Sequence, residues 1–404
     1  MTALVMAAFS ICFLIPTAAL AGDAPEPPEA ARDAFAEGLA VEGDGQQALV
    51  GRRSHFAKAV RLAPDWAAAQ FQLGKTMNAQ GDAAGAVAHL RRAGDLDPGN
   101  PAVQAELALA CRRIGRMAEA ISHYSRALVL APDDPLIHNN FGVALLAAGQ
   151  PEGAARHFER AAELDNKYPD PLVNLGNYSR SIGEERQAGE YYRRAIEVAP
   201  SAPESRLALA QLMTDAGRHR EAQEQLEAAV AANPKDAPSR FRLALVLATR
   251  QRYGAAVENL KTVLDLAPEY REARYNLGLC CHYMGRNDEA IRVFEDALRI
   301  DPDYAWLYYG LGLVYEDRED SALAEEALTM ALEKDPGLRP AKAALKRIRG
   351  EQPKQKLAWP WGLMCGATSD DTSAGIAGAG LPFAVTFAAL FGPAFFIRAR
   401  RRRK

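Results

Sequence analysis

Four of the seven histidines recur at a fixed spacing, and histidine is a common metal ligand. His55, His89, His123 and His157 each lie 34 residues apart. Equivalent atoms of neighbouring structural repeats are roughly 10–20 Å apart, about one to two helix-packing distances. Zinc ligands must all come within about 2.0–2.1 Å of the metal, so this row cannot hold one ion. We therefore predict duplicated surface histidines and no metal site, with a mild pH-dependent surface charge as the remaining hypothesis.

The five cysteines indicate no disulfide framework. Cys111 and Cys281 occupy equivalent repeat positions five repeats apart, far beyond the roughly 7 Å between Cα atoms that a disulfide allows. The adjacent residues Cys280 and Cys281 diverge on a helix, and Cys12 and Cys365 lie near the two ends of the chain. We predict that Cys111 and Cys281 are buried as small hydrophobic side chains.

No motif typical of an enzyme stands in the sequence: there is no nucleophile elbow, phosphate-binding loop or metal-binding helix motif. Gly310 and Gly312 form a Gly-x-Gly pair, but they lie inside an expected helix. We therefore predict no catalytic, cofactor-binding or metal-binding residue and a protein that is not an enzyme.

The histidine spacing belongs to a 34-residue period that runs along most of the chain. Its clearest markers are prolines, with Asn166 in register at the one gap: Pro64, Pro98, Pro132, Pro200, Pro234, Pro268, Pro302 and Pro336. A period of this length indicates a solenoid of two-helix units. If the proline is position 32 of each repeat, the first repeat begins at Asp33.

Small and large residues alternate at fixed positions of this period. Position 8 is Gly or Ala in all nine repeats, as at Gly278, and positions 20 and 27 are nearly always Ala, as at Ala290 and Ala297. Position 24 is always Leu, Phe or Tyr. Small residues let two helices approach closely, while the proline, as at Pro302, ends the second helix.

This pattern resembles the tetratricopeptide repeat (TPR) family from Asp33 to about Leu338. The resemblance implies an all-α fold: a right-handed superhelix (α-solenoid) of nine helix-turn-helix repeats over residues 33–338, with a capping helix at 339–350. It also implies a concave groove, lined by the first helices, that binds proteins. One hairpin cannot bury its apolar face alone, so stability comes from stacking.

In the family, the groove uses positions 2, 5, 9, 12 and 13 of the first helix. Toward the N-terminus this implies polar and basic partner-binding residues: Lys75, Arg112, Asn139, Asn177 and Arg180. Toward the C-terminus it implies aromatic, acidic and histidine residues: Tyr275, His282, Trp306, Tyr309 and Glu316. Protein interfaces favour aromatic residues with charges around them, so we hypothesise that the second set holds an extended or helical peptide. An ordinary groove wall without a hot spot is the alternative.

Two family subtypes can be compared with this chain. Chaperone-clamp repeats carry a basic residue at position 5, and no repeat here has Lys or Arg at that position. Superhelices associated with glycosyltransferases carry asparagine at position 6, which Asn140, Asn174 and Asn276 match only in part.

Both termini indicate export and membrane attachment. Residues 1–21 read as a signal peptide, with an uncleaved anchor as the alternative, and residues 22–32 as a linker. After a second linker at 351–373, the uncharged run 374–397 is long enough to span a membrane of roughly 30 Å, and residues 398–404 are mainly basic. The positive-inside rule places this tail in the cytoplasm and the repeats outside it. The tail also resembles tripartite bacterial sorting signals, although no known recognition motif is present.

The net charge of −3 gives no indication of nucleic-acid binding, and nothing indicates a small-molecule substrate. We predict a scaffold or assembly factor of the bacterial envelope that binds protein partners through the groove and the membrane through its C-terminal segment. The alternatives are a cytoplasm-facing, membrane-anchored adaptor and a helper subunit of an envelope polysaccharide or glycosyltransferase system.

Overall fold

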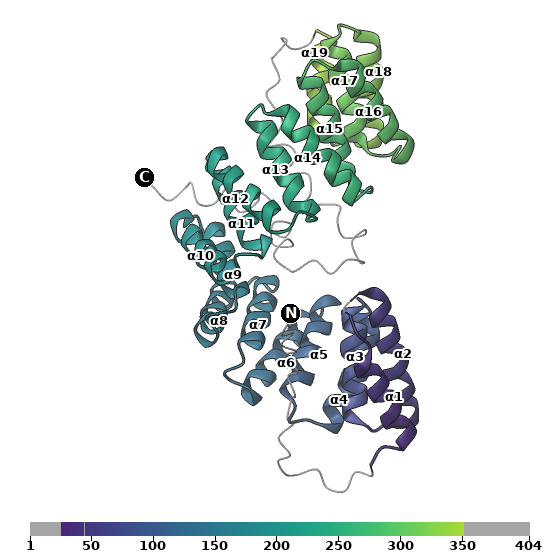
Figure 1. Cartoon of the computed structure of the whole chain (residues 1–404), viewed down its shortest axis with the longest axis vertical. Helices are drawn as coiled ribbons and strands as arrows, with labels where there is room; N and C mark the ends of the chain where they lie inside the picture. Colours follow the sequence, from purple (N-terminus) through teal and green to yellow (C-terminus); the bar gives the residue numbers. More distant parts are fainter. Residues whose placement is uncertain (1–25, 44, 351–404) are drawn as a thin grey trace, which may run out of the picture. The chain divides into compact units, whose positions relative to one another are not determined.

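The computed structural model describes residues 26–43 and 45–350, and the regular structure in these ranges is entirely helical (Figure 1). The helices are α1 (Glu29–Ala40), α2 (Gln46–Leu62), α3 (Ala67–Ala79), α4 (Ala83–Leu96), α5 (Pro101–Arg113), α6 (Met117–Leu130), α7 (Pro135–Ala147), α8 (Pro151–Leu164), α9 (Asp170–Ser181), α10 (Glu185–Val198), α11 (Pro203–Asp215), α12 (His219–Ala232), α13 (Ala237–Thr249), α14 (Tyr253–Leu266), α15 (Arg271–Tyr283), α16 (Asn287–Ile300), α17 (Ala305–Asp317), α18 (Ser321–Lys334) and α19 (Arg339–Ile348).

The predicted signal peptide (1–21), C-terminal linker (351–373), membrane span (374–397) and basic tail (398–404) lie outside the described residues. Within the described ranges, no helix combines the length and the apolar character that crossing a membrane requires.

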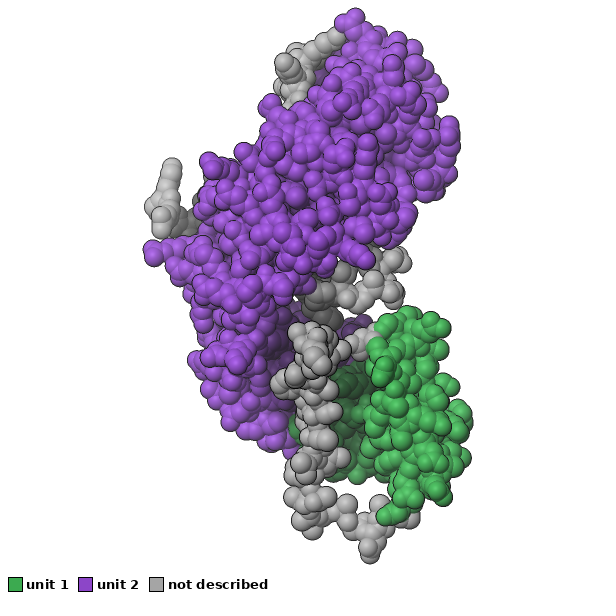
Figure 2. Space-filling model, viewed as in Figure 1, with its two compact units in different colours: residues 1–106 green, residues 107–404 purple. Residues whose placement is uncertain are grey.

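The chain forms two compact units, which Figure 2 colours separately. Unit 1 ends at Glu106 and unit 2 begins at Leu107, so the division falls inside α5. In unit 1, α1 packs on α2 and α3 on α4. In unit 2, the pairs α7–α8, α9–α10, α11–α12, α13–α14, α15–α16 and α17–α18 pack as hairpins, and α19 packs on α17 and α18. The predicted all-α fold of consecutive helical hairpins with a final capping helix is confirmed.

In the hairpins with glycine at position 8, that residue packs against the large one at position 24; in the first hairpin, Gly38, two residues earlier in the register, packs against Phe56 instead. A Cβ atom placed on Gly142 would lie 2.5 Å from Cε1 of Phe158, and one on Gly278 would lie 2.4 Å from Cε1 of Phe294. Both rings are fully buried. Protein interiors are close-packed, so the missing side chain is the space that the ring fills.

The turn between the two helices of a hairpin needs a left-handed backbone at position 15. Six repeats place glycine there, for example Gly217 with φ 73°. The seventh and ninth repeats place Gln251 (φ 60°) and Glu319 (φ 65°) in the same conformation. A residue other than glycine pays roughly 1 kcal/mol for this geometry, so these two turns are strained.

We expect Gln251→Gly and Glu319→Gly each to stabilise the protein by about 0.5–1 kcal/mol, because glycine adopts positive φ without steric cost. The measurement is the midpoint of urea unfolding of the full chain. Arg250→Gly is the matched control: its φ is −84°, so glycine there offers no relief and should not stabilise. Equal or lower midpoints for both position-15 variants would contradict the assignment of strain.

The turn between repeats contains a hydrogen bond that the sequence analysis missed. The side chain at position 4 of a first helix donates to the carbonyl of the proline six residues before it. The pairs are Gln70–Pro64 (2.7 Å), His138–Pro132 (2.9 Å), Arg240–Pro234 (2.7 Å), Arg274–Pro268 and Tyr308–Pro302 (3.2 Å). Because four different residue types make this same hydrogen bond, no single residue type at position 4 identifies it in the sequence.

Candidate binding surface

The first helices of adjacent repeats in unit 2 contact one another and form a continuous layer. Contacts join α9 to α11, α11 to α13, α13 to α15 and α15 to α17. The groove positions lie on these helices. The side chains at these positions therefore either pack between neighbouring first helices or remain accessible on the layer.

Asn139 and Asn177, two predicted partner-binding residues, are buried and hydrogen-bonded within the protein. Asn139 Nδ2 donates to Tyr168 Oη (3.0 Å), and Asn174 Nδ2 donates to Asn139 Oδ1 (2.9 Å). Tyr192 Oη donates to Asn177 Oδ1 (2.7 Å), and burial raises the pKa of Tyr192 to about 12. These amides stabilise the stack, so they are not freely available to a partner.

Arg180 belongs to a polar row that crosses three repeats. Its guanidinium lies 3.5 Å from Asp215, whose carboxylate accepts a hydrogen bond of 2.7 Å from Gln211 Nε2. Arg242 Nη1 then donates to Gln211 Oε1 (2.7 Å). These four residues, called the polar row below, thus pair with one another within the protein.

Tyr275 and Tyr309, two further predicted partner-binding residues, are buried, with exposed fractions of 0% and 2%. Both rings make edge contacts with Trp306, at 5.6 Å and 5.8 Å between centroids. Position 5 lies where α15 meets α17, and the stacking of these helices removes it from water. Burial accordingly raises the pKa of Tyr309 to about 12. Trp306 alone of the three stays partly exposed.

Glu316 and His282 are also engaged within the protein. Glu316 accepts two hydrogen bonds from Arg347 of α19, at 3.1 Å and 2.9 Å, and the two side chains are only 19% and 8% exposed. His282 Nδ1 lies 2.9 Å from Oδ1 of Asn287, whose amide donates to Asp317 (3.1 Å). The acidic part of the predicted set is therefore already paired.

The two remaining predicted residues differ from each other. Lys75, in unit 1, is exposed. Arg112 is half-buried, and burial is the main cause that lowers its pKa, while the nearby Tyr124 opposes the shift.

The histidine row is less exposed than predicted. His89 and His157 are half-buried, and each pairs with position 4 of its own repeat: His89 with Gln70 (2.8 Å) and His157 with His138 (2.9 Å between Nδ1 atoms). Across residues 26–43 and 45–350, no three His, Cys, Asp or Glu side chains come together as a metal site would need. Cys111, Cys280 and Cys281 are buried thiols that take part in no disulfide among the described residues, and burial raises the pKa of Cys281 to about 11.

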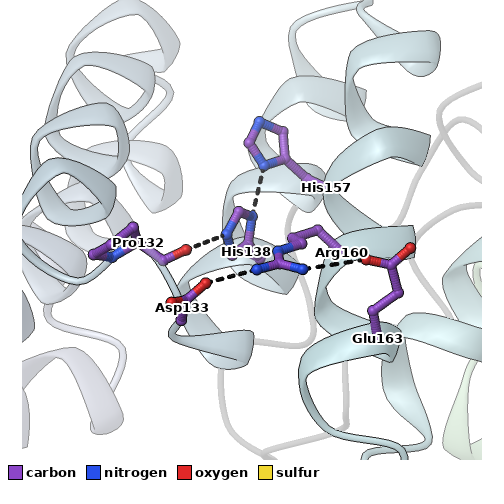
Figure 3. A network of polar contacts seen from close by, with 6 residues as sticks. All are labelled: Pro132, Asp133, His138, His157, Arg160 and Glu163. Carbon is purple, nitrogen blue, oxygen red and sulfur yellow. Dashed lines mark hydrogen bonds and ion pairs between the residues drawn. The ribbon is translucent and has the colours of Figure 1, made fainter.

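Figure 3 shows the histidine pair in its surroundings, with Arg160 between Asp133 (2.7 Å) and Glu163 (3.3 Å) beside it. The carbonyl of Pro132 can only accept, so His138 Nε2 carries the hydrogen of that bond. Neutral His138 then offers Nδ1 as an acceptor, and His157 Nδ1 donates to it. Burial, followed by the electrostatic effects of the neighbouring His138 and Arg156, lowers the pKa of His157 to about 4.

We expect this pair to make stability depend on pH. In the unfolded chain His157 titrates near its ordinary pKa of about 6.5, so between pH 6.5 and 4 the unfolded state binds more protons. The stability that neutral His157 contributes is therefore fully present above about pH 6.5 and is lost as the pH drops toward 4. With solvent screening of the half-exposed ring, the loss is about 1–2 kcal/mol. Urea unfolding at pH 7.5 and 4.5 should show a smaller loss in His157→Gln; equal losses would contradict the expectation.

Part of the accessible surface of the layer, beside the polar row, is apolar and aromatic. Leu207 of α11, Phe241 of α13 and Trp306 of α17 are half-buried at groove positions 5, 5 and 2. Phe241 packs on Tyr270 at 4.8 Å between ring centroids. These three residues are called the apolar strip below.

This architecture defines an α-solenoid repeat protein whose first helices in unit 2 form a layer. Family models assign it more closely: one described as "TPR repeat" matches residues 279–317, and one described as "Tetratricopeptide repeat" matches 77–139 and 183–244. A third, "Anaphase-promoting complex, cyclosome, subunit 3", matches 226–297. The chain is a tetratricopeptide repeat protein. A search of the curated proteins found no match.

Solved structures with a similar arrangement include the APC/C hetero-tetramer Cut9-Hcn1, with 18% identity, coverage of 75% of this chain and 63% of that chain, and a TM-score of 0.48. YrrB, described as a TPR protein with an unusual peptide-binding site, has 26% identity, coverage of 48% and 99%, and a TM-score of 0.40. Pseudomonas aeruginosa pilF has 22% identity, coverage of 52% and 95%, and a TM-score of 0.44. This chain thus spans under two thirds of the length of the first of these structures.

Proposed function

We propose that the protein is a non-catalytic scaffold that binds a protein partner along the first-helix layer of unit 2. The observation that carries this proposal is the apolar strip: Leu207, Phe241 and Trp306 stay partly exposed on a layer whose polar groups are largely paired. Aromatic side chains that are already fixed lose little conformational entropy on binding. Trp306 is braced by two buried tyrosines and Phe241 by Tyr270, so both fit the role of an interface hot spot.

The partner-binding set predicted from the family pattern is revised accordingly. Trp306 remains in the proposed contact surface, and Arg180 contributes through the polar row. Tyr275 and Tyr309 act behind Trp306, as its support. A partner that combines apolar side chains with polar groups able to meet Asp215 and Arg242 matches this surface.

The proposal includes export and attachment to the membrane, with the repeats on the periplasmic or extracellular side. Its support is the sequence alone: the apolar residues 1–21, the uncharged run 374–397 and the basic cluster 398–404. Protease added to intact spheroplasts should cleave the repeat region. Resistance of that region until the cells are lysed would place it in the cytoplasm instead.

The binding proposal is tested with the full chain crosslinked in envelope and in cytosolic extracts. The double variant Phe241→Ala/Trp306→Ala should lose at least about tenfold of the captured partner, because two hot-spot side chains are removed. The matched control is Val129→Ala/Ile300→Ala, which removes exposed apolar side chains (82% and 64%) away from the groove positions. Thermal unfolding of both variants checks the fold. Equal capture by the two variants would refute the proposed surface.

A further inference from the structure

The last helix, α19, is the first helix of an incomplete tenth repeat. Arg339 lies 34 residues after Ala305, so α19 continues the register of α17, and it packs on α17 and α18. Its position 8 is Lys346, whereas all nine complete repeats have Gly or Ala there. The face that would otherwise receive a second helix is therefore charged.

This face of α19 carries only basic charged residues. Arg339, Lys342 and Lys346 are exposed, and their spacing of three and four residues places them on the same side of the helix. Within the described part of the chain, none of the three has an acidic partner at ion-pair distance. Arg349, further along this face, pairs with Glu325 at 2.8 Å. We call Arg339, Lys342 and Lys346 the basic face.

Capping of the solenoid accounts for a polar face but not for its sign. Residues 339–349 contain basic side chains and no Asp or Glu. Basic residues suit the last turn of a helix, but Arg339 and Lys342 lie in the first turn, where the helix dipole disfavours positive charge by about 0.3–1 kcal/mol. A mixture of signs would solubilise the cap at no such cost. The arrangement therefore indicates an anionic partner.

A partner helix cannot complete this repeat. Position 8 is Gly or Ala in every complete repeat, and at Gly278 even a Cβ atom would lie 2.4 Å from the ring of Phe294. The long side chain of Lys346 leaves no room for such packing. A broad anionic surface needs no close approach of two helices and fits the basic face better.

The chain itself indicates which surface this is. The uncharged run that begins at residue 374 follows Gly350 by 24 residues, a tether of roughly 25–30 Å if flexible. A solenoid held by that run would keep α19 close to the bilayer. We propose that the basic face of α19 docks on anionic lipid headgroups at the surface of the membrane that holds the chain. This inference rests on the proposed membrane attachment.

Each basic residue near an anionic bilayer should strengthen the contact roughly fivefold at moderate salt, and the effect should fall at high salt. In the test, the full chain is reconstituted into vesicles of phosphatidylcholine alone or of phosphatidylcholine with about 30% of the anionic lipid phosphatidylglycerol. Acylation rates of single lysines are then read by mass spectrometry. Lys342 and Lys346 should react about fivefold or more slowly on the anionic vesicles, and 0.5 M salt, roughly a 4–5 Å screening length, should remove the difference.

Lys235, exposed on the turn before α13, is the internal control and should react equally on both vesicles. Flotation of the vesicles measures attachment separately. Equal rates at Lys342 and Lys346 on both vesicles, with the chain still floating, would overturn the basic-face inference alone. A chain that floats with neither vesicle would overturn both attachment and inference. Equal protection by soluble polyglutamate would replace the lipid surface with an acidic polypeptide and so also overturn it.

Discussion

Gly142→Ala is expected to lower the stability of unit 2 by about 2–3 kcal/mol, although it adds a single methyl group. The new Cβ would lie 2.5 Å from Cε1 and 2.8 Å from Cδ1 of Phe158, where real contacts are not found below 3.0 Å. Phe158 is fully buried, so its ring cannot retreat without disturbing α7 and α8. The midpoint of urea unfolding measures the loss, followed by amide exchange in the two helices, because solenoids open locally.

The chain contains both the rescue and the control for this substitution. Two of its repeats pair alanine with leucine, Ala210 with Leu226 and Ala244 with Leu260. Gly142→Ala/Phe158→Leu should therefore be less destabilised than the sum of its single variants, by about 1 kcal/mol or more. Gly153→Ala, in the same hairpin, meets Leu145 at 3.6 Å and Arg156 Nη2 at 4.0 Å, both ordinary contacts, and should be neutral or stabilising. Additivity within about 0.5 kcal/mol would contradict the steric account.

Removing Arg347 is the second large perturbation, with an expected cost of about 3 kcal/mol. Its guanidinium makes a bidentate pair with Glu316, and Arg347→Met would leave that carboxylate mostly buried without a counter-charge. The loss should appear as faster amide exchange in α17 and α19, because the pair joins these two helices.

A second charge pair, between the C-cap residue of α19 and α18, provides the comparison. Arg349 and Glu325 are 48% and 44% exposed, so Arg349→Met should cost no more than about 1 kcal/mol. Glu316→Leu/Arg347→Met, which removes both charges, should recover much of the loss, since the penalty lies in the unpaired charge. If Arg347→Met and Arg349→Met lower the free energy of unfolding equally, the burial of the Arg347–Glu316 pair does not strengthen it.

The residues within one hairpin could be predicted from the sequence. Gly142 and Phe158 lie 16 residues apart, the same spacing recurs in the later repeats, and the helical period fixes which sides of the two helices meet. In the first repeat the structure differs, because Gly38, two residues before position 8, packs on Phe56. The small residue, the large residue and the proline therefore each had a predictable environment. The position-15 turn was predictable where glycine occupies it, while the conformations of Gln251 and Glu319 follow from the register of the repeat.

The binding residues were less predictable, because exposure depends on the next repeat. Tyr275 and Phe241 both occupy position 5, yet Tyr275 is buried against Trp306 while Phe241 remains half-exposed. The family pattern places Glu316 among the groove residues, but Arg347 of α19, 31 residues away, pairs with its carboxylate. The family pattern predicts which side of the helix a position lies on, but the side chains of the neighbouring repeat determine whether that position is exposed to water.

By itself, the sequence determined the repeat, the all-α fold and the core of each hairpin, since those contacts are local and recur at a fixed period. Only the tertiary structure decided which groove residues remain open, that His138 pairs with His157, and that Arg347 neutralises Glu316. The physical reason is that stacking joins residues of different repeats, where the identity of both partners, and not the period, sets burial and charge.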